Sequence, residues 1–368
     1  MLCEDTSCGT GPGCSPQSYT VNSTTIGGSA TVTPGTLFYS SGPTPLVYPI
    51  SGTTYWAVLD PAVHYSAQSQ AYWLLERPVS GTAQLFTWHN NNTGFPVNGA
   101  IVVHNPNSFQ VTMTIYNVGV KTGFGGGVQM WYDYFTSPQA TVTIASGATV
   151  IIDSLSVTNV PNTYPWGLVA LVNFSGPSGA ASVAVYDVAY FDSTANLPSA
   201  KLAPNDATTG KRGLGSGYST PIQASIHVAN SAVPVNPSLI TQYTCMTDLD
   251  SFSGDDVPVV TDPDGGQSKL QGCYGCIQPV VLTVYNDDAV YSHNIIISGG
   301  NPANTQGAKL AFNFNVPGGC SATELSQYEY LNLISDTLTP GGHGVYNFSF
   351  MDAAGYDAPL AVGVTVTS

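Results

Sequence analysis

Charged residues are scarce in this sequence. Asp, Glu, Lys and Arg make up 8% of the 368 residues, against about 25% in an average soluble domain. Cations are the scarcest, because 7 Lys and Arg stand against 22 Asp and Glu, for a net charge of −15. Nucleic acids and anionic membranes bind through cationic patches. The composition therefore argues against both partners and predicts a surface of neutral polar side chains.

Long apolar runs and targeting signals are also lacking. The apolar stretch at residues 167–174 is far shorter than the 20 or so residues that cross a membrane. The first twenty residues contain neither a basic region nor an apolar run, so they do not form a signal peptide. We expect either a removed signal or release by lysis, and in both cases a location outside the cell or on a cell or spore surface.

Helical periodicity is nearly absent. The best short candidate is residues 321–335, which open with SATE, a possible capping box. Elsewhere β-branched residues alternate with polar ones, and the strands that this predicts form three expected hairpins: 100–103 with 110–117, 140–144 with 149–152, and 167–174 with 181–186. The predicted fold class is all-β, with two antiparallel β-sandwich or jelly-roll-like domains in tandem after a flexible Cys-rich N-terminal tail.

The distribution of residue types suggests the domain bounds. All five tryptophans precede residue 193, and four of the seven cysteines follow residue 217. We expect a connector tail and possible donor strand at 1–35, a Trp-rich sandwich at 36–192, a linker or long loop at 193–217 and a Cys-containing sandwich at 218–368. A short likeness between residues 114–117 (TIYN) and 283–286 (TVYN) suggests that the two sandwiches are related.

The cysteines carry the most specific signal. Seven is an odd number, so at least one thiol stays free or pairs between chains under oxidising conditions. Cys3, Cys8 and Cys14 lie in a Gly- and Pro-containing tail, and we interpret them as candidates for disulfides between neighbouring subunits. The alternative is one local pair and an incidental third thiol. The strand-like segment after them has the pattern to add to a neighbour's sheet edge.

The other four cysteines are candidates for structural disulfides: Cys245, Cys273, Cys276 and Cys320. The CYGC spacing at 273–276 also fits a redox pair or half of a zinc site. A group of six carboxylates lies in the same region: Asp248, Asp250, Asp255, Asp256, Asp262 and Asp264. Clustered carboxylates on Gly-containing loops suit calcium, although the EF-hand spacing is missing. The alternative is that these residues form turns.

Catalytic motifs are weak. The histidines form no HExxH motif, and no GxSxG elbow is present. His89 and His104 flank a predicted hairpin and are expected to be surface polar residues. Glu76 would need a facing acid for glycosidase chemistry. The glycines of GFGGG at 123–127 are not followed by a predicted helix, which argues against a phosphate loop. We therefore expect no enzyme.

Aromatic residues crowd one segment of the first predicted sandwich: Tyr55, Trp56, Tyr65, Tyr72, Trp73, Phe86 and Trp88. On an exposed sheet face they would stack on sugar rings, but such residues more often form the core between sheets. The core interpretation is favoured, and polysaccharide binding stays an alternative.

Two resemblances bear on function. Residues 99–120, 140–154 and 166–188 resemble β-rich domains of secreted Gram-positive surface proteins, which implies an extracellular setting without an assigned activity. The Cys-rich tail before a β-sandwich is similar in plan to endospore appendage subunits, where it would make Cys3, Cys8 and Cys14 connector thiols. We expect a structural subunit that assembles with other copies into an extracellular fibre or coat. The alternatives are a surface adhesin or carbohydrate-binding module and a double jelly-roll capsid protein.

Overall fold

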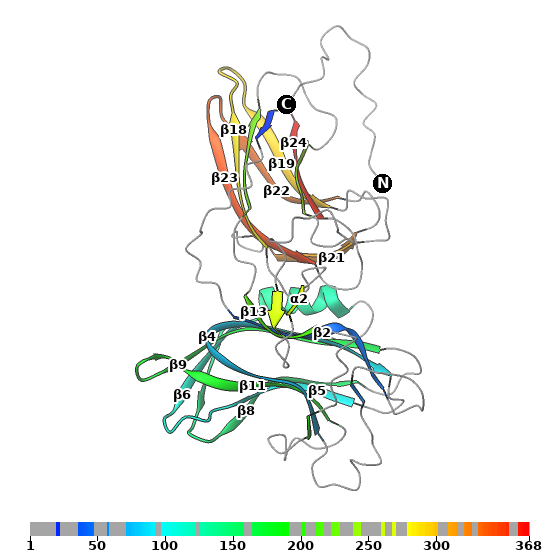
Figure 1. The fold of residues 1–368 in the computed structure, drawn as a ribbon. Helices are drawn as coiled ribbons and strands as arrows, with labels where there is room; N and C mark the ends of the chain where they lie inside the picture. The colour runs from blue at the N-terminus through cyan, green and yellow to red at the C-terminus, as the bar shows by residue number, and fades with distance from the viewer. Residues whose placement is uncertain are drawn as a thin grey trace. The chain divides into compact units, whose positions relative to one another are not determined.

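The computed structural model consists mostly of antiparallel β-sheet, which confirms the predicted fold class (Figure 1). It describes residues 20–22, 36–47, 57–58, 71–92, 97–122, 126–157, 164–190, 201–202, 211–216, 222–228, 238–243, 259–261, 267–269, 278–300, 308–314, 320–325, 330–352 and 360–367.

The chain divides into two compact units. The first comprises Pro34–Gly217 and Asp256–Leu270, and the second comprises Met1–Thr33, Tyr218–Asp255 and Gln271–Ser368. Each unit therefore includes a segment that lies outside its main run of sequence. Within the expected linker at 193–217, residues 201–202 and 211–216 are strands. The domain bounds expected from composition stay a prediction.

The first unit is a sandwich of two layers that share one long strand. The layers run in the order β17-β16-β13-β2-β4-β9-β6-β7 and β4-β11-β5-β8. The longer strands are β2 (Thr36–Val47), β4 (Ala71–Asn92), β5 (Val97–His104), β6 (Val111–Thr122), β7 (Ala140–Ile144), β8 (Thr149–Val157), β9 (Tyr164–Gly176) and β11 (Ser182–Tyr190). The shorter strands are β3 (Ala57–Val58), β10 (Gly179–Ala180), β12 (Lys201–Leu202), β13 (Lys211–Ser216), β16 (Val259–Thr261) and β17 (Gln267–Lys269).

Strand β4 passes from one layer to the other at Gly81. Its residues 71–80 pair with β11, and its residues 81–91 pair with β9. Gly81 has φ +64°, a left-handed conformation that a side chain disfavours and glycine accepts readily. Beyond this point β2 also pairs with β4, in parallel. The inward faces of both layers enclose one apolar core, built from residues such as Leu85, Ile101, Val172 and Val185.

Two of the three predicted hairpins are wrong and the third forms only next to its turn, although all of their strands form. Strand β5 pairs with β11 and β8, whereas β6 pairs with β7 and β9. Strands β7 and β8 likewise lie in different layers, and so do β9 and β11. The first two connections are thus β-arches that cross the sandwich. In the third, the chain first pairs back on β9 through β10 and then passes to β11 in the other layer. Alternation fixes which residues face the core, but it does not specify the strand with which a segment pairs.

A helix follows the glycines at 123–127, contrary to our expectation. Helix α2 (Gly126–Thr136) covers the face of the first layer opposite the core, with Met130, Trp131 and Tyr134 buried. It comes so close to β6 that a Cβ on Gly119 would lie 2.0 Å from the carbonyl oxygen of Met130. The sequence signal of α2 is a short apolar face. A search for helical patterns of twelve or more residues misses it, because α2 has 11 residues.

The predicted helix at 321–335 is also wrong. These residues contribute to β21 (Cys320–Leu325), paired with β20 (Ala308–Phe314), and to β22 (Tyr330–Leu338), paired with β19 (His293–Gly300). Sheet pairing therefore overrides the local capping signal of SATE, as tertiary context commonly does.

The second unit consists of a six-stranded sheet and a four-stranded sheet, in the orders β1-β14-β18-β23-β20-β21 and β15-β24-β19-β22. Its remaining strands are β1 (Thr20–Asn22), β14 (Ile222–Val228), β15 (Ser238–Tyr243), β18 (Gln278–Asn286), β23 (His343–Asp352) and β24 (Leu360–Thr367). Leu282, Val284, Ile295, Ile297 and Phe348 are buried in it.

Both units contain the same pair of arches. In the first, Asn105 ends the strand β5, its backbone N–H donates to Ala148, and its side-chain amide donates to the carbonyl groups of Phe109, Ile144 and Ala145.

In the second unit, Asn286 has the corresponding contacts with the carbonyl groups of Gly342, Tyr291, Leu338 and Thr339. The two units are therefore alike in their arches, but the sequence match of Asn117 with Asn286 does not identify them, because the counterpart of Asn286 is Asn105.

Candidate functional sites

A histidine and an aspartate form a buried pair inside the first unit. His89 on β4 and Asp187 on β11 come from different layers, and His89 Nε2 lies 2.7 Å from Asp187 Oδ2. Both side chains are 0% exposed. Trp166 packs on the imidazole, with ring centroids 4.9 Å apart, and a Cβ on Gly99 of the opposite layer would collide with this indole. Trp166 thus fixes the position of His89, and Gly99 leaves the space that the indole needs.

This pair is closed off from solvent. Its full burial denies access to a substrate, while the mutual hydrogen bond offsets part of the cost of removing two polar groups from water. The expectation that His89 is a surface residue is wrong. His104, on β5, is half-buried and its Nδ1 lies 3.1 Å from Thr149 Oγ1. Asp187 was missed, although it continues the inward positions of Val183 and Val185 and so places a carboxylate where the alternation predicts core.

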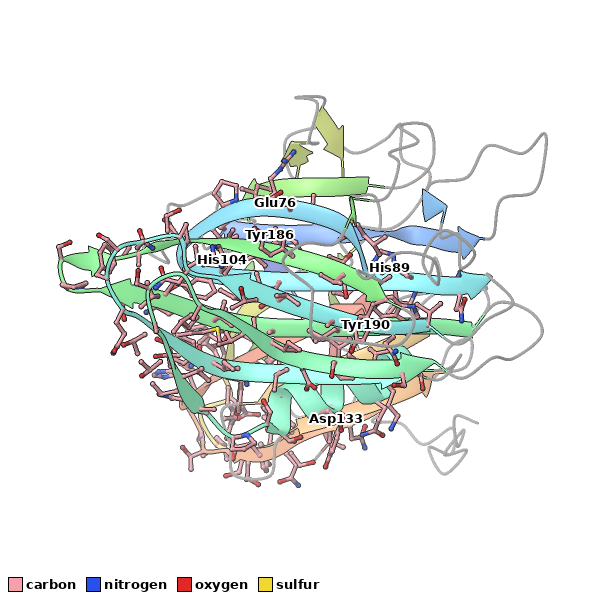
Figure 2. All side chains as sticks on the ribbon, turned by 90° about the horizontal axis from the view of Figure 1, so that it is seen from below. Glu76, His89, His104, Asp133, Tyr186 and Tyr190 are labelled. Carbon is pink, nitrogen blue, oxygen red and sulfur yellow. The ribbon has the colours of Figure 1, made fainter. Side chains whose placement is uncertain are left out.

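Glu76 faces a tyrosine and not a second acid. It lies directly opposite Tyr186 across the β4–β11 pair, on the side of the second layer that faces away from the core (Figure 2). Burial, followed by the charge and hydrogen bond of Glu76, raises the pKa of Tyr186 to about 12. Tyr186 also joins a separate buried cluster with Val102, Val188 and Tyr190. A carboxylate bonded to a phenol in this way does not form the acid pair that glycoside hydrolysis uses.

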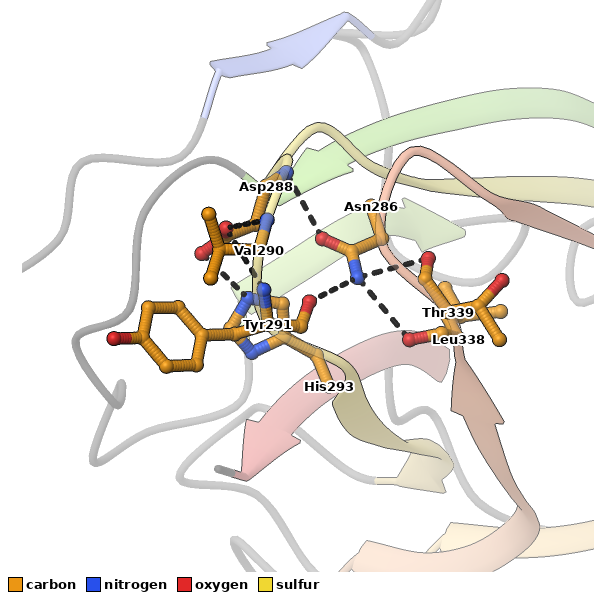
Figure 3. A network of polar contacts seen from close by, with 7 residues as sticks. All are labelled: Asn286, Asp288, Val290, Tyr291, His293, Leu338 and Thr339. Carbon is orange, nitrogen blue, oxygen red and sulfur yellow. Dashed lines mark hydrogen bonds and ion pairs between the residues drawn. The ribbon is translucent and has the colours of Figure 1, made fainter.

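A loop in the second unit is held in place by hydrogen bonds and exposes two apolar side chains (Figure 3). Between β18 and β19, Asp288 Oδ1 accepts hydrogen bonds from the backbone N–H groups of Val290 and Tyr291. These bonds, with a smaller contribution from His293, hold the pKa of Asp288 below its usual value. Val290 is 70% exposed and Tyr291 is 57% exposed.

The arch of the first unit presents its aromatic residue differently. Phe109 is 37% exposed and packs against Gly176, where an added Cβ would lie 2.7 Å from its ring. The amide of Asn105 reaches the fourth residue after it, and that of Asn286 reaches the fifth. The same arch therefore has one more residue in the second unit and turns its aromatic side chain outward.

One edge of the six-stranded sheet is completed by the N-terminal segment. Strand β1 pairs antiparallel with β14 through Thr20↔His227, Val21↔Ile226 and Asn22↔Ser225. Strand β14 is paired along its whole length with β18 on its other side. Among the described residues, 222–224 and 228 of β14 have no strand partner on the β1 side.

One edge of the first unit is completed by a hairpin from the C-terminal half of the sequence. Strands β16 and β17 pair with each other over three residues. Among the described residues, β16 pairs with β13 through Leu214↔Thr261 and Gly215↔Val260. Strand β13 itself pairs with β2 over six residues, 211–216, and Leu214 packs against the core.

Most of the predicted site residues lie outside the described residues. This holds for Cys3, Cys8, Cys14, Cys245, Cys273, Cys276 and all six aspartates from Asp248 to Asp264. Cys320 is the first residue of β21, opposite Asn313. The disulfides and the calcium site therefore stay predictions. Within the parts of the chain that the structure describes, no three His, Cys, Asp or Glu side chains are placed to hold a metal ion.

The aromatic segment contributes to the interior where its side chains are described. Phe86 and Trp88 are buried on the face of β4 that α2 covers, and Phe86 stacks on Trp131 with centroids 6.2 Å apart. Both residues are buried, as the core interpretation expects, but they lie between the sheet and α2 and not between the two layers. In the described segments no helix has the length and apolarity to cross a membrane.

Comparison with known proteins adds little. No family model and no curated protein matches the chain. One similar solved structure is the CupB6 tip adhesin from Pseudomonas aeruginosa, at 11% identity, 90% coverage of this chain, 92% of that chain and a TM-score of 0.16. Another is the CBM22-1-CBM22-2 tandem domain of Paenibacillus barcinonensis Xyn10C, at 9% identity, 82% and 99% coverage and a TM-score of 0.13. Scores this low carry no functional weight.

Proposed function

We propose that the protein is a structural subunit of an extracellular or surface assembly, without catalysis, in which the N-terminal segment of one copy adds a strand to β14 of the next. The observation that carries this proposal is the antiparallel pairing of β1 with the edge of β14. It identifies β14 as an edge that accepts a strand from a segment about 200 residues away in sequence.

The attachment of β1 is short, which favours exchange. Three residue pairs hold β1, whereas β14 has seven residues that pair with β18. The uncovered part of β14 leaves room for a longer strand, and the segment around β1, SYTVNSTT, supplies alternating residues. A neighbour's segment that paired along all of β14 would satisfy more backbone groups than the pairing within one chain.

The covalent chain permits this donation. Thirteen residues, 23–35, separate β1 from β2, and at full extension they reach about 45 Å. Cys3, Cys8 and Cys14 precede β1, so a segment bound to a neighbour would carry its thiols to that neighbour. Disulfides formed there would make dissociation depend on reduction. The low share of charged residues, 8%, supports the proposal too, because a contact between copies then buries few charges.

The first experiment combines two chains that each carry one added cysteine. Chains with Val21→Cys and chains with Ile226→Cys are mixed, oxidised and mapped by peptide mass spectrometry, so that a 21–226 disulfide forms only between copies. The matched control replaces Ile226→Cys by Gln223→Cys, which lies on β14 outside the β1 register. We expect the 21–226 link to appear with assemblies that electron microscopy resolves. Assemblies without that link, or no assemblies, would refute the proposal.

The second experiment removes strand pairing or the thiols. Val21→Pro takes away a backbone N–H and fixes φ, whereas Val21→Thr keeps both the N–H and the β-branched shape. We expect Val21→Pro to yield folded monomers and Val21→Thr to assemble. Chains with Cys3, Cys8 and Cys14 changed to Ser should assemble but dissociate in mild denaturant. Equal resistance to denaturant with and without these thiols would exclude the covalent part.

A second candidate function is contact with a polysaccharide or other surface ligand. The observation in its favour is the exposure of Val290 and Tyr291 on a loop that Asn286 and Asp288 already hold in place. An ordered aromatic side chain loses little conformational entropy on binding. Retention of the protein on immobilised polysaccharides, with loss of retention in Tyr291→Ala, would support it. Passage of both proteins without delay would count against it.

A further inference from the structure

The hairpin β16–β17 belongs to the first unit, although its sequence lies within that of the second. The chain leaves the second unit after Asp255 and returns at Gln271. Between these points it forms the hairpin and occupies the outer edge of β13. The two units thus each receive an edge strand from a distant part of the chain.

The hairpin is weakly attached to a firmly held edge. Two residue pairs join β16 to β13, while six join β13 to β2. Leu214 of β13 packs against the core of the first unit, so β13 would keep its place if the hairpin left. The backbone groups of β13 on that side would then be unpaired, which is the template that another strand recognises.

The lengths of the two connections set how far the hairpin can reach. Fifteen residues, 244–258, join β15 to β16, and eight residues, 270–277, join β17 to β18. At full extension these spans reach about 50 Å and about 27 Å. The entropy cost of closing a loop grows slowly with its length, so pairing within one chain has only a modest advantage over pairing between two at high concentration.

We infer that the β13 edge is a second strand-accepting surface, and that its partner is the β16–β17 hairpin of a second copy of this chain. A reciprocal exchange, in which each copy donates its hairpin to the other, satisfies both edges and closes into a dimer with two-fold symmetry. The exchange uses the pairs Leu214↔Thr261 and Gly215↔Val260 unchanged, but between chains.

Isotope mixing tests this inference on the full chain. The variant Gly215→Cys/Val260→Cys is prepared with ¹⁴N and with ¹⁵N, mixed at high concentration, oxidised and digested. Exchange predicts 215–260 disulfide peptides with one label of each kind, approaching about half of the total for random two-fold pairing. Peptides with matching labels only would overturn the inference. Peptides that join the cysteine introduced at position 215 or 260 to a native cysteine differ in mass and are counted separately.

Two further measurements complete the test. If the double variant does not fold, labelled and unlabelled unmodified chains are mixed, and native mass spectrometry looks for mixed dimers that persist in the presence of reductant. The absence of dimers over the whole concentration range would overturn the inference. Repeating the experiment with Val21→Pro separates this exchange from the proposed function: the mixed 215–260 peptides should remain while strand donation by β1 is lost.

Discussion

At the scale of single residues, the first unit depends on a polar pair in an apolar interior. His89 and Asp187 connect the two layers with both groups fully buried, close to the buried polar residues Thr87 and Asn91 on β4. A pair of this kind contributes less than a well-packed apolar substitute, but removing one partner leaves the other buried without its bond. A single substitution therefore lowers the free energy of unfolding by more than the intact pair contributes to it.

We predict that Asp187→Ala lowers the free energy of unfolding of the first unit by about 3 kcal/mol or more. The double variant His89→Leu/Asp187→Leu should lose less than this, because neither partner remains unpaired. Urea denaturation followed by circular dichroism measures both. Asp153→Ala, on the neighbouring strand β8, is the control, since this half-buried carboxylate bonds only the adjacent Ser154 N–H among the described contacts. A loss from Asp187→Ala no larger than that from the control would contradict the prediction.

Tyr186 gives a pH dependence with a defined sign. Its pKa is raised to about 12 in the folded chain, and an unfolded tyrosine ionises near pH 10. The unfolded state therefore releases its proton first as the pH rises. The stabilisation due to Tyr186 is present in full below about pH 10 and is lost between about pH 10 and pH 12.

The ultraviolet difference between the unmodified protein and Tyr186→Phe isolates this ionisation. We expect the difference signal to have its midpoint near the raised pKa, about 12. Glu76→Gln should move it down, because the variant removes the negative charge that opposes phenolate formation. A midpoint near pH 10 in the unmodified protein would show that Tyr186 is solvated and that the Glu76 contact does not form.

At the scale of elements, the arches are the recurring design. One asparagine ends a strand of one sheet, and its amide N–H groups satisfy carbonyl groups of the facing turn, both at Asn105 and at Asn286. Its side-chain oxygen accepts the N–H of the residue two positions later, Asn107 or Asp288. An asparagine is suited to this position because it has both donors and an acceptor.

We predict that Asn286→Asp destabilises the second unit by about 2 kcal/mol or more, because a carboxylate oxygen replaces the donor facing three carbonyl groups. Asn105→Asp should do the same in the first unit. Hydrogen exchange with mass spectrometry should show faster exchange near 287–292 for the first variant and near 106–110 for the second. Asn98→Asp is the control, since the Asn98 oxygen that accepts from Ser156 is retained. Unchanged exchange in both loops would contradict the prediction.

At the scale of the whole molecule, two units with the same arches are joined in one chain. In both, the strand that leads to the asparagine pairs with the strand that follows the facing turn. His104 is paired with Thr149 in the first unit, and Tyr285 is paired with His343 in the second. Each unit also takes an edge strand from outside its main sequence run, β1 in one case and β16–β17 in the other. The proposed assembly uses these edges. A strand that the chain adds to a distant edge of its own can also be added to the same edge of another copy.

The strand content and the fold class were predictable from the sequence. Alternating β-branched residues placed β5 to β9 and β11 close to their observed positions, and the neutral composition pointed to the same polar surface in both halves. Phe86 and Trp88 were also correctly favoured as buried, although they lie under α2 and not between the two layers. Their signal is local, since hydrophobic period and turn residues act within a few positions along the chain.

The wrong expectations concern partners and short elements. The hairpins at 100–117 and 140–152 were expected because neighbours in sequence usually pair, yet each connection crosses to the other layer. Helix α2 was missed because its eleven residues are stabilised mainly by the sheet beneath it, where Gly119 admits the helix backbone. His89 was assigned to the surface because its partner, Asp187, lies 98 positions away.

The sequence by itself therefore determined that this chain is all-β, poor in cations and rich in turns, because these properties follow from composition and from a two-residue period. Only the tertiary structure decided which strands are neighbours, that His89 and Asp187 meet, and that β1 and β16–β17 fill the edges of β14 and β13. A strand's pattern specifies the face that it buries. Its neighbours are decided by the packing of all strands together, since backbone hydrogen bonds between strands are the same for any sequence.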